Sequence, residues 1–322
     1  MIDRTERSAE PGLPRPGRLA GPSRLRPARL SASFPTAWSL HLAGLLRLVV
    51  LIGPVMLLGS AGEARAIGDR GADGDFERRD SFHFTLYQDV DIDRSSGFYG
   101  SRRFEQEVLD RLEEAFDRLD RILDLRPEDK LVVYVWDPAL FDARYAGLFR
   151  FPAAGFYGGS IHIRGDTRVT RELVQVLHHE LVHAAFDAEA PRLVLPAWMN
   201  EGIAEWFEAR AGGKRRLSTA EHGALVELAG RGALFRLAEL SGPSFGGLAT
   251  PAASVAYLQS YGFIDYLVQQ HGERDLVRFW SAVLRSRKLD RSAQRVYKRD
   301  LRALEEAFLR SLGAVSYTHL TL

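Results

Sequence analysis

The sequence of 322 residues contains no cysteine. This absence excludes disulfide bonds, thiolate nucleophiles and thiolate metal ligands. It does not indicate a cellular compartment, because a chain of this length can bury a core large enough to fold without covalent cross-links. Any catalytic or metal-binding chemistry must therefore come from histidine, carboxylate, hydroxyl and amide groups.

The sequence also lacks a concentration of basic residues. The formal net charge is +1, from 43 basic and 42 acidic side chains. Residues 1–66 contain nine of the basic and four of the acidic residues, which leaves 34 basic and 38 acidic residues, or −4, in the remainder. Domains that bind nucleic acid carry a basic surface that neutralises phosphates. We therefore expect no nucleic-acid partner.

No apolar run is long enough to span a bilayer comfortably, which takes about 20 residues. The run at 48–61 is shorter, and Arg47 precedes it. Residues 64–66, Ala-Arg-Ala, have the small-x-small form of a signal-peptidase site. We expect residues 1–66 to be a disordered leader and signal peptide, and the protein to be exported to the periplasm, the cell envelope or the medium. An uncleaved signal would instead tether the protein to the membrane.

The remaining chain divides into three parts. Residues 67–80 are rich in glycine and aspartate and are expected to form a linker. Residues 81–314 are expected to form one domain. Residues 315–322 break the preceding helical pattern, and we expect them to be a non-native tail.

Within the domain, the apolar periodicity predicts strands first and helices later. The expected elements are a strand at 82–88, a helix at 103–124, a strand at 130–136, a glycine turn with a strand at 160–164, and a helix from about residue 170. From residue 196 onward the pattern is helical, with breaks near residue 212 and across 241–254. This order is typical of an α+β fold rather than of alternating βαβ units.

The stretch LHHELVHAAF contains an H-E-x-x-H motif formed by His179, Glu180 and His183. Residues four apart lie on one face of a helix, so two imidazole nitrogens can bind one ion. Glu180 would then lie beside the ion, where it could accept a proton from water. The neighbouring His178 faces elsewhere on the helix and is expected to be a packed or solvated neighbour rather than a ligand.

A catalytic zinc site uses three protein ligands and leaves one position open. Downstream, WMNEGIAEWFE places Glu201 and Glu205 four residues apart on a helical pattern. Seventeen residues separate His183 from Glu201, which is enough for the chain to turn back.

H-E-x-x-H followed by N-E-G-x-A-E resembles the gluzincin metallopeptidases, in particular the peptidase MA-like and aminopeptidase-N-like families. The resemblance implies a thermolysin-like α+β catalytic domain, with a small mixed sheet, zinc-binding helices and a helical C-terminal subdomain. It implies Zn²⁺ as cofactor, Glu201 as third ligand and Glu205 as the carboxylate that orients a ligand histidine. It also implies hydrolysis of peptide or protein substrates.

The resemblance extends to two further parts of the chain. AYLQSYGFIDYL resembles the helix that carries the catalytic tyrosine of aminopeptidase-N-like enzymes, so that Tyr257, or Tyr261 one turn later, would stabilise the oxyanion. In gluzincins an edge strand before the zinc helix binds the extended substrate, and Gly159, Ser160, Ile161 and His162 would belong to that strand. The nearby AAGFYGGS lacks the carboxylate with which aminopeptidases hold a substrate amine, which argues against aminopeptidase activity.

Three other interpretations start from the same sequence. The H-E-x-x-H-x-x-G-x-x-H pattern fails, because Phe186 replaces its glycine and Glu189 its last histidine. GPSFG resembles a serine nucleophile elbow but lacks the strand and helix that should flank it. The third is an inactive zinc-bearing domain that binds peptides or partners. An enzyme is favoured over it because the base, Glu180, is present.

Overall fold

The computed structural model describes residues 76–90, 92, 100–145 and 147–318. The predicted leader and signal peptide lie outside these residues, as do most of the predicted linker and residues 319–322. In the described part of the chain, no helix has both the length and the apolar content needed to cross a membrane.

The described strands form one five-stranded mixed sheet in the order β1-β2-β3-β5-β4. Strands β2, β3 and β5 are parallel, and β1 and β4 join the two edges in antiparallel orientation. The strand bounds are Glu77–Asp80 (β1), Phe84–Asp89 (β2), Leu131–Trp136 (β3), Gly155–Tyr157 (β4) and Ile161–Arg164 (β5).

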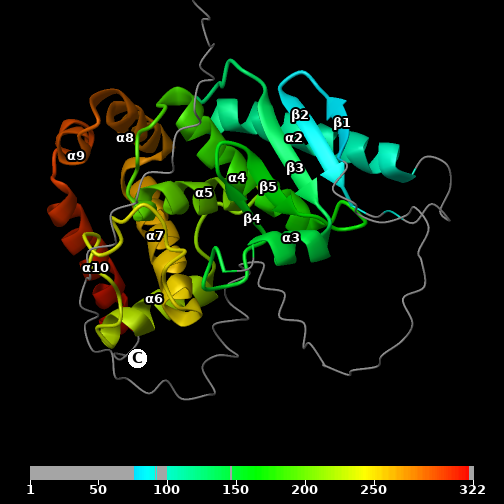
Figure 1. Cartoon of the computed structure of the whole chain (residues 1–322). Helices are drawn as coiled ribbons and strands as arrows, with labels where there is room; N and C mark the ends of the chain where they lie inside the picture. The colour runs from blue at the N-terminus through cyan, green and yellow to red at the C-terminus, as the bar shows by residue number, and fades with distance from the viewer. Residues whose placement is uncertain (1–75, 91, 93–99, 146, 319–322) are drawn as a thin grey trace, which may run out of the picture. The chain divides into compact units, whose positions relative to one another are not determined.

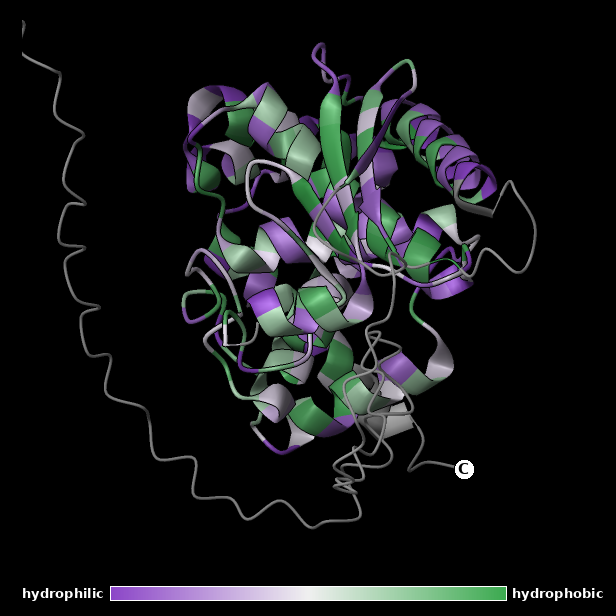
Figure 2. Cartoon of the chain, turned by 45° about the vertical axis from the view of Figure 1, so that its right-hand side comes forward, coloured by the Kyte–Doolittle hydropathy of each residue, from purple (hydrophilic) through white to green (hydrophobic). Residues whose placement is uncertain are grey.

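Side chains alternate between the two faces of this sheet, because successive residues of a strand point in opposite directions. On one face the buried side chains include Leu86, Val133 and Ile163. Helices α2 (Gly100–Leu123) and α4 (Arg171–Glu189) cover that face, with α2 packing on β2 and α4 on β4 and β5 (Figure 1). Figure 2 shows α2 with its hydrophilic positions on the side away from the strands, as an amphipathic helix requires.

The opposite face of the sheet carries a row of aromatic side chains. Tyr87, Tyr134, His162 and Phe156 are paired in register across β2, β3, β5 and β4. Their rings stack with centroids 4.9, 5.1 and 4.9 Å apart along the row. Helix α3 (Pro138–Tyr145) packs beside this row through Tyr145, whose ring meets that of Phe156 edge-on.

The C-terminal half consists of helices, as its periodicity predicts. Helices α6 to α10 lie together to the left of the sheet in Figure 1, and α5 reaches from this group to α4. Their bounds are Ala197–Ala211 (α5), Thr219–Gly230 (α6), Thr250–His271 (α7), Glu273–Ser286 (α8), Leu289–Tyr297 (α9) and Leu301–Thr318 (α10).

The contact between α5 and α7 depends on Gly202. A Cβ atom at this position would lie 2.7 Å from the backbone oxygen of Ser260 and 2.9 Å from Cγ1 of Ile264. Real Cβ atoms do not approach other atoms so closely, so only glycine lets the two helices pack at this distance. Gly202 directly follows Glu201, and the contact therefore fixes α7 relative to that carboxylate.

The α+β class is confirmed, but three local predictions need correction. Residues 77–80, expected in the linker, form β1 because they pair with β2. Residues 155–157, expected to be part of a turn, form β4, and α3 was not predicted. Helix α10 continues to Thr318, through the first four residues of the predicted tail. The first two differences arise from pairing with residues distant in the sequence.

Replacing Gly202 by alanine should lower the free energy of unfolding by about 1–3 kcal/mol, because backbone atoms of α7 must move to admit the methyl group. Urea denaturation of purified variants measures this change. Gly223→Ala is the matched control: no atom lies within 4 Å of the added Cβ on α6, and alanine there should raise stability by up to about 1 kcal/mol. Equal effects of the two substitutions would contradict the close-packing argument.

Candidate metal centre

The H-E-x-x-H motif lies on helix α4, in the interior of the protein. The helix begins after Thr170, whose hydroxyl oxygen accepts a hydrogen bond from the Leu173 N–H at 3.2 Å. Such a cap satisfies one of the free N–H groups of the first turn. Two turns later His179, Glu180 and His183 lie between the sheet and α5, and their side chains are almost fully buried.

Helix α5 brings Glu201 to the two histidines. Its Oε2 atom lies 3.3 Å from Nε2 of His179 and 3.4 Å from Nε2 of His183. All three ligand atoms lie within 4.8 Å of one another. Zinc bonds of about 2.0–2.1 Å at tetrahedral angles separate neighbouring ligand atoms by about 3.4 Å. The two separations from Glu201 match this value, so the spacing of the three side chains suits a tetrahedral ion with one position left open.

The electrostatics of the three groups also favour a cation. Burial, the largest single influence, would lower the pKa values of His179 and His183, but the neighbouring carboxylates, Glu201 first, together outweigh it and raise both. Burial would likewise raise the pKa of Glu201, and the two histidines lower it instead. The buried carboxylate is thus stabilised by positive charge. Protons on the two histidines, or a divalent ion in place of those protons, can supply this charge.

The other nitrogen of His179 faces two further carboxylates of α5. Its Nδ1 atom lies 3.5 Å from Oε2 of Glu208 and 4.0 Å from Oε1 of Glu205. Burial and the neighbouring Glu208 charge raise the pKa of Glu205 to about 8. Glu208 is therefore the nearer acceptor for the Nδ1–H group. It was not among the predicted site residues, although its position three residues after Glu205 places it near the same helix face.

Glu180 lies beside the three candidate ligands. Its Oε2 atom is buried and has no hydrogen-bond partner among the described residues. Burial raises the pKa of its carboxyl group. A small pocket of about 80 Å³, called the metal pocket below, opens here. Its lining includes His179, Glu180, Tyr257 and the segment Phe151–Gly155. The carboxylate can therefore contact a molecule held in this pocket.

The structure distinguishes the two candidate tyrosines. Tyr257 lines the pocket, and its ring is held edge-on between Phe151 and Phe245, with centroids 6.1 and 5.1 Å away. Burial and the nearby carboxylates, Glu201 first, raise its pKa, so the hydroxyl remains a donor. Tyr261 does not line the pocket; it is buried, with the Lys214 ammonium 5.0 Å from the centre of its ring.

The predicted substrate strand is misplaced. Strand β5 is paired on both sides, with β3 and with β4, so it has no open edge for a peptide. Gly159 and Ser160 belong to the turn between β4 and β5, Ile161 is in the core, and His162 belongs to the aromatic row on the far face. None of the four lines the metal pocket. The strand at this edge of the sheet is β4.

His178 is packed in the interior, which decides between the packed and the solvated positions expected for it. Its side chain is 7 % exposed, and its Nδ1 atom lies 2.7 Å from the Val174 carbonyl oxygen one turn earlier. The serine of GPSFG, Ser244, lies between α6 and α7 rather than between a strand and a helix. The structure therefore gives no support to a nucleophile elbow.

Comparison with known proteins identifies a family for the chain but no individual relative. No curated protein matches the chain significantly. The profile of the peptidase MA superfamily, however, matches residues 133–314. This range begins in β3, ends in α10 and includes all the candidate ligands, Glu180 and Tyr257. More than half of the sequence is covered, and the chain belongs to the peptidase MA superfamily.

Proposed function

We propose that the protein is a zinc-dependent peptidase that hydrolyses peptide bonds. The observation that carries this proposal is the position of Glu180. Its unpartnered carboxylate oxygen lies beside three atoms whose spacing fits a tetrahedral ion. A purely structural zinc site would normally use a fourth protein ligand. An ion with one open position and an adjacent base is the arrangement that hydrolysis requires.

His179, His183 and Glu201 would hold the ion. When bound, zinc acts as a Lewis acid and makes water a better nucleophile near neutral pH. Glu180 accepts the proton that water loses as its oxygen bonds to the carbonyl carbon. Glu180 then gives that proton to the nitrogen as the C–N bond breaks. The Tyr257 hydroxyl donates a hydrogen bond to the carbonyl oxygen, on which negative charge develops.

The substrate backbone would lie along β4. Within the described residues, no strand pairs with the outer edge of β4. The segment that ends in Gly155 lines the metal pocket, so a peptide added at this edge would pass the ion. Pairing with an open strand edge binds extended peptides through main-chain hydrogen bonds. This placement replaces the one predicted from the sequence for residues 159–162.

We also propose that the protein acts outside the cytoplasm. The support is the apolar run at 48–61 followed by the small-x-small site at 64–66. Both lie outside the described residues. N-terminal sequencing of the protein from its native host distinguishes a cleaved signal from a retained membrane anchor.

Glu180→Gln should retain zinc but lose nearly all hydrolysis, because the amide has the shape of the carboxylate and cannot accept the proton. The rate should fall by at least about 10²-fold. Zinc content by elemental analysis and cleavage of unstructured casein are measured on the same preparations. Loss of zinc together with activity would contradict the assigned role. A zinc-loaded wild-type protein that cleaves nothing would favour the binding-domain interpretation.

Zinc binding should release at least one proton per ion at about pH 7. The pKa values of His179 and His183 are raised above their ordinary value, so both histidines bind protons more tightly than a free imidazole does, and the metal competes with those protons. The apparent zinc affinity should therefore increase between about pH 6 and pH 8. Calorimetry in buffers of different ionisation enthalpy counts these protons. A zinc affinity independent of pH would show that the histidines are not ligands.

Glu208→Gln should weaken zinc binding by about 10–100-fold, because the Nδ1–H group of His179 loses its nearest charged acceptor. Glu205→Gln should have a smaller effect, since its carboxylate is more distant and carries a raised pKa. Competition with a fluorescent chelator measures both affinities. A larger effect of Glu205→Gln would assign the orienting role to that residue instead.

A further inference from the structure

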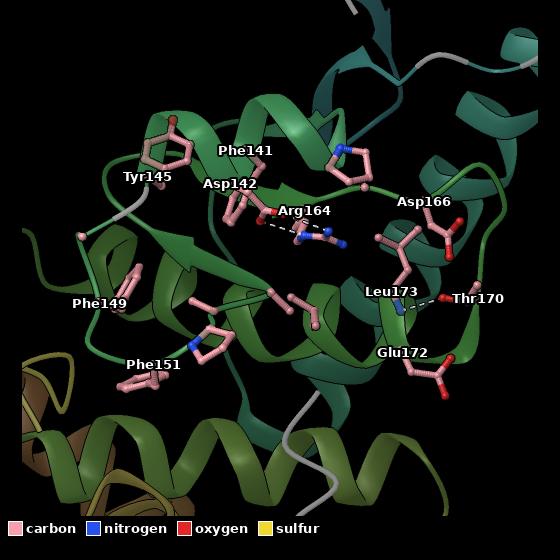
Figure 3. Close-up of a pocket in the computed structure, with 17 residues that line it drawn as sticks. Phe141, Asp142, Tyr145, Phe149, Phe151, Arg164, Asp166, Thr170, Glu172 and Leu173 are labelled. Atoms are coloured by element: carbon pink, nitrogen blue, oxygen red, sulfur yellow. Dashed lines mark hydrogen bonds and ion pairs between the residues drawn. The ribbon is translucent and has the colours of Figure 1, made fainter. Parts of the chain in front are cut away.

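A second and larger cavity adjoins the metal pocket. It has a volume of about 530 Å³, within the range of about 300–1,000 Å³ typical of ligand sites. Helix α3, the segment 147–154, the end of β5 and the first turns of α4 enclose it (Figure 3). The two cavities share Val176 and the four residues 151–154 as walls. A peptide that passes the metal pocket can therefore place a neighbouring side chain in the larger cavity.

The cavity extends along α4 away from the candidate ligands. Val176 and Leu173 line it about one and two turns from His179 toward the helix N-terminus, and Glu172, next to Leu173, lines it as well. At 1.5 Å per residue, His179 and Glu172 are about 10 Å apart along the helix axis. A side chain that starts near the ion must therefore be long to reach the far end.

The two ends of the cavity differ in character. Figure 3 shows Phe149 and Phe151 at one end, and Asp166, Thr170 and Glu172 at the other. Phe151, at the apolar end, also lines the metal pocket. The acidic end is distant from the metal pocket. An occupant that enters from the metal pocket thus meets apolar walls first and carboxylates last.

A single basic side chain, Arg164, lines the cavity. Its Nε and Nη2 atoms each donate a hydrogen bond of 2.9 Å to Asp142, which joins the end of β5 to α3. The hydrogen bond to Asp142 raises the pKa of Arg164 against the effect of burial, and the charges of Asp137 and Asp166 act in the same direction. Arg164 is therefore already neutralised and offers little attraction to an anion.

The acidic side chains outnumber this arginine. Asp142, Asp166 and Glu172 line the cavity with Arg164, which gives a formal charge of −2. The N-terminus of α4 offsets part of the Glu172 charge. Asp166 uses Oδ1 to accept the Thr167 N–H, and both it and Glu172 are exposed to the cavity and solvent. The field at this end therefore favours a cation.

We propose that this cavity is a specificity site for a long cationic side chain, arginine or lysine, of the peptide substrate. The inference deepens the proposed peptidase function and rests on it. The aliphatic stem packs against the apolar end, and the charged group lies between Asp166 and Glu172. The arginine or lysine would therefore lie the same number of residues from the cleaved bond in every substrate.

The test uses end-blocked hexapeptide pools that are random, without arginine or lysine, at five positions and carry arginine, citrulline, norleucine or glutamate at the sixth. Citrulline has the shape of arginine without its charge, so the arginine-to-citrulline ratio isolates the electrostatic contribution. Cleavage by the zinc-loaded protein is followed by mass spectrometry. Binding of the same pools to Glu180→Gln is measured by competition, which does not require turnover.

The cleavage rate and the affinity should both favour arginine over citrulline by about 5- to 10-fold, as expected for two partly exposed ion pairs. The variant with both Asp166→Asn and Glu172→Gln should reduce this ratio to about one, leaving the norleucine pool unchanged. Asp117→Asn with Glu128→Gln, two exposed positions on α2 and after it, is the matched control and should leave the ratio unchanged.

The outcomes separate the two proposals. Cleavage without a preference for arginine over citrulline would overturn the specificity site and leave the peptidase function standing. Binding that prefers arginine, without cleavage of any pool, would support the site and overturn the peptidase function. A preference that survives the double substitution would also overturn the site, because the charge would then be recognised elsewhere. Neither binding nor cleavage of any pool would overturn both.

Discussion

The arrangement of the whole site depends on one buried carboxylate, Glu201, held between two imidazoles. A buried charge is strongly unfavourable unless positive groups surround it. Here Glu180, Glu205 and Glu208 lie close by, so several carboxylates share a small region with two histidines. Such a concentration of negative charge is stable only with bound protons or a cation. The charge of the site, like its geometry, thus suits a bound cation.

Two glycines give this centre its geometry by permitting close packing. Gly202 allows α7 to lie against α5, and this packing brings Tyr257 of α7 close to Glu201 of α5. On the other side, a Cβ at Gly155 would lie 2.7 Å from Cγ1 of Val176 and 2.9 Å from Cδ1 of Ile163. Strand β4 therefore lies directly on α4, one turn from His179. The sheet and the helical half are both fixed to the metal-binding helix by contacts that a larger side chain would disrupt.

The sequence predicted the parts of this site that depend on local spacing. Helical periodicity and the i, i+4 rule predict that His179 and His183 lie on one helix and Glu201 and Glu205 on another, as α4 and α5 have them, because such spacing concerns neighbours within a helix. Strand order could not be predicted in this way, since the pairing of β5 on both sides depends on residues distant in the chain. The choice between Tyr257 and Tyr261 depends on how α7 is rotated against α5. Glu208 was not predicted because the motif that carries the resemblance, N-E-G-x-A-E, ends at Glu205.

The position of β4 at the end of the sheet has a consequence for the solubility of the protein. An open strand edge that can bind a substrate backbone can also bind the edge of another chain, which is a common origin of aggregation. Strand β4 has only three residues, so any such pairing would form few hydrogen bonds. Pro152, just before it, lacks an N–H group and cannot extend the ladder. A short edge next to a proline thus offers little to a second sheet, whereas a peptide in the proposed position would also be aligned by the neighbouring pockets.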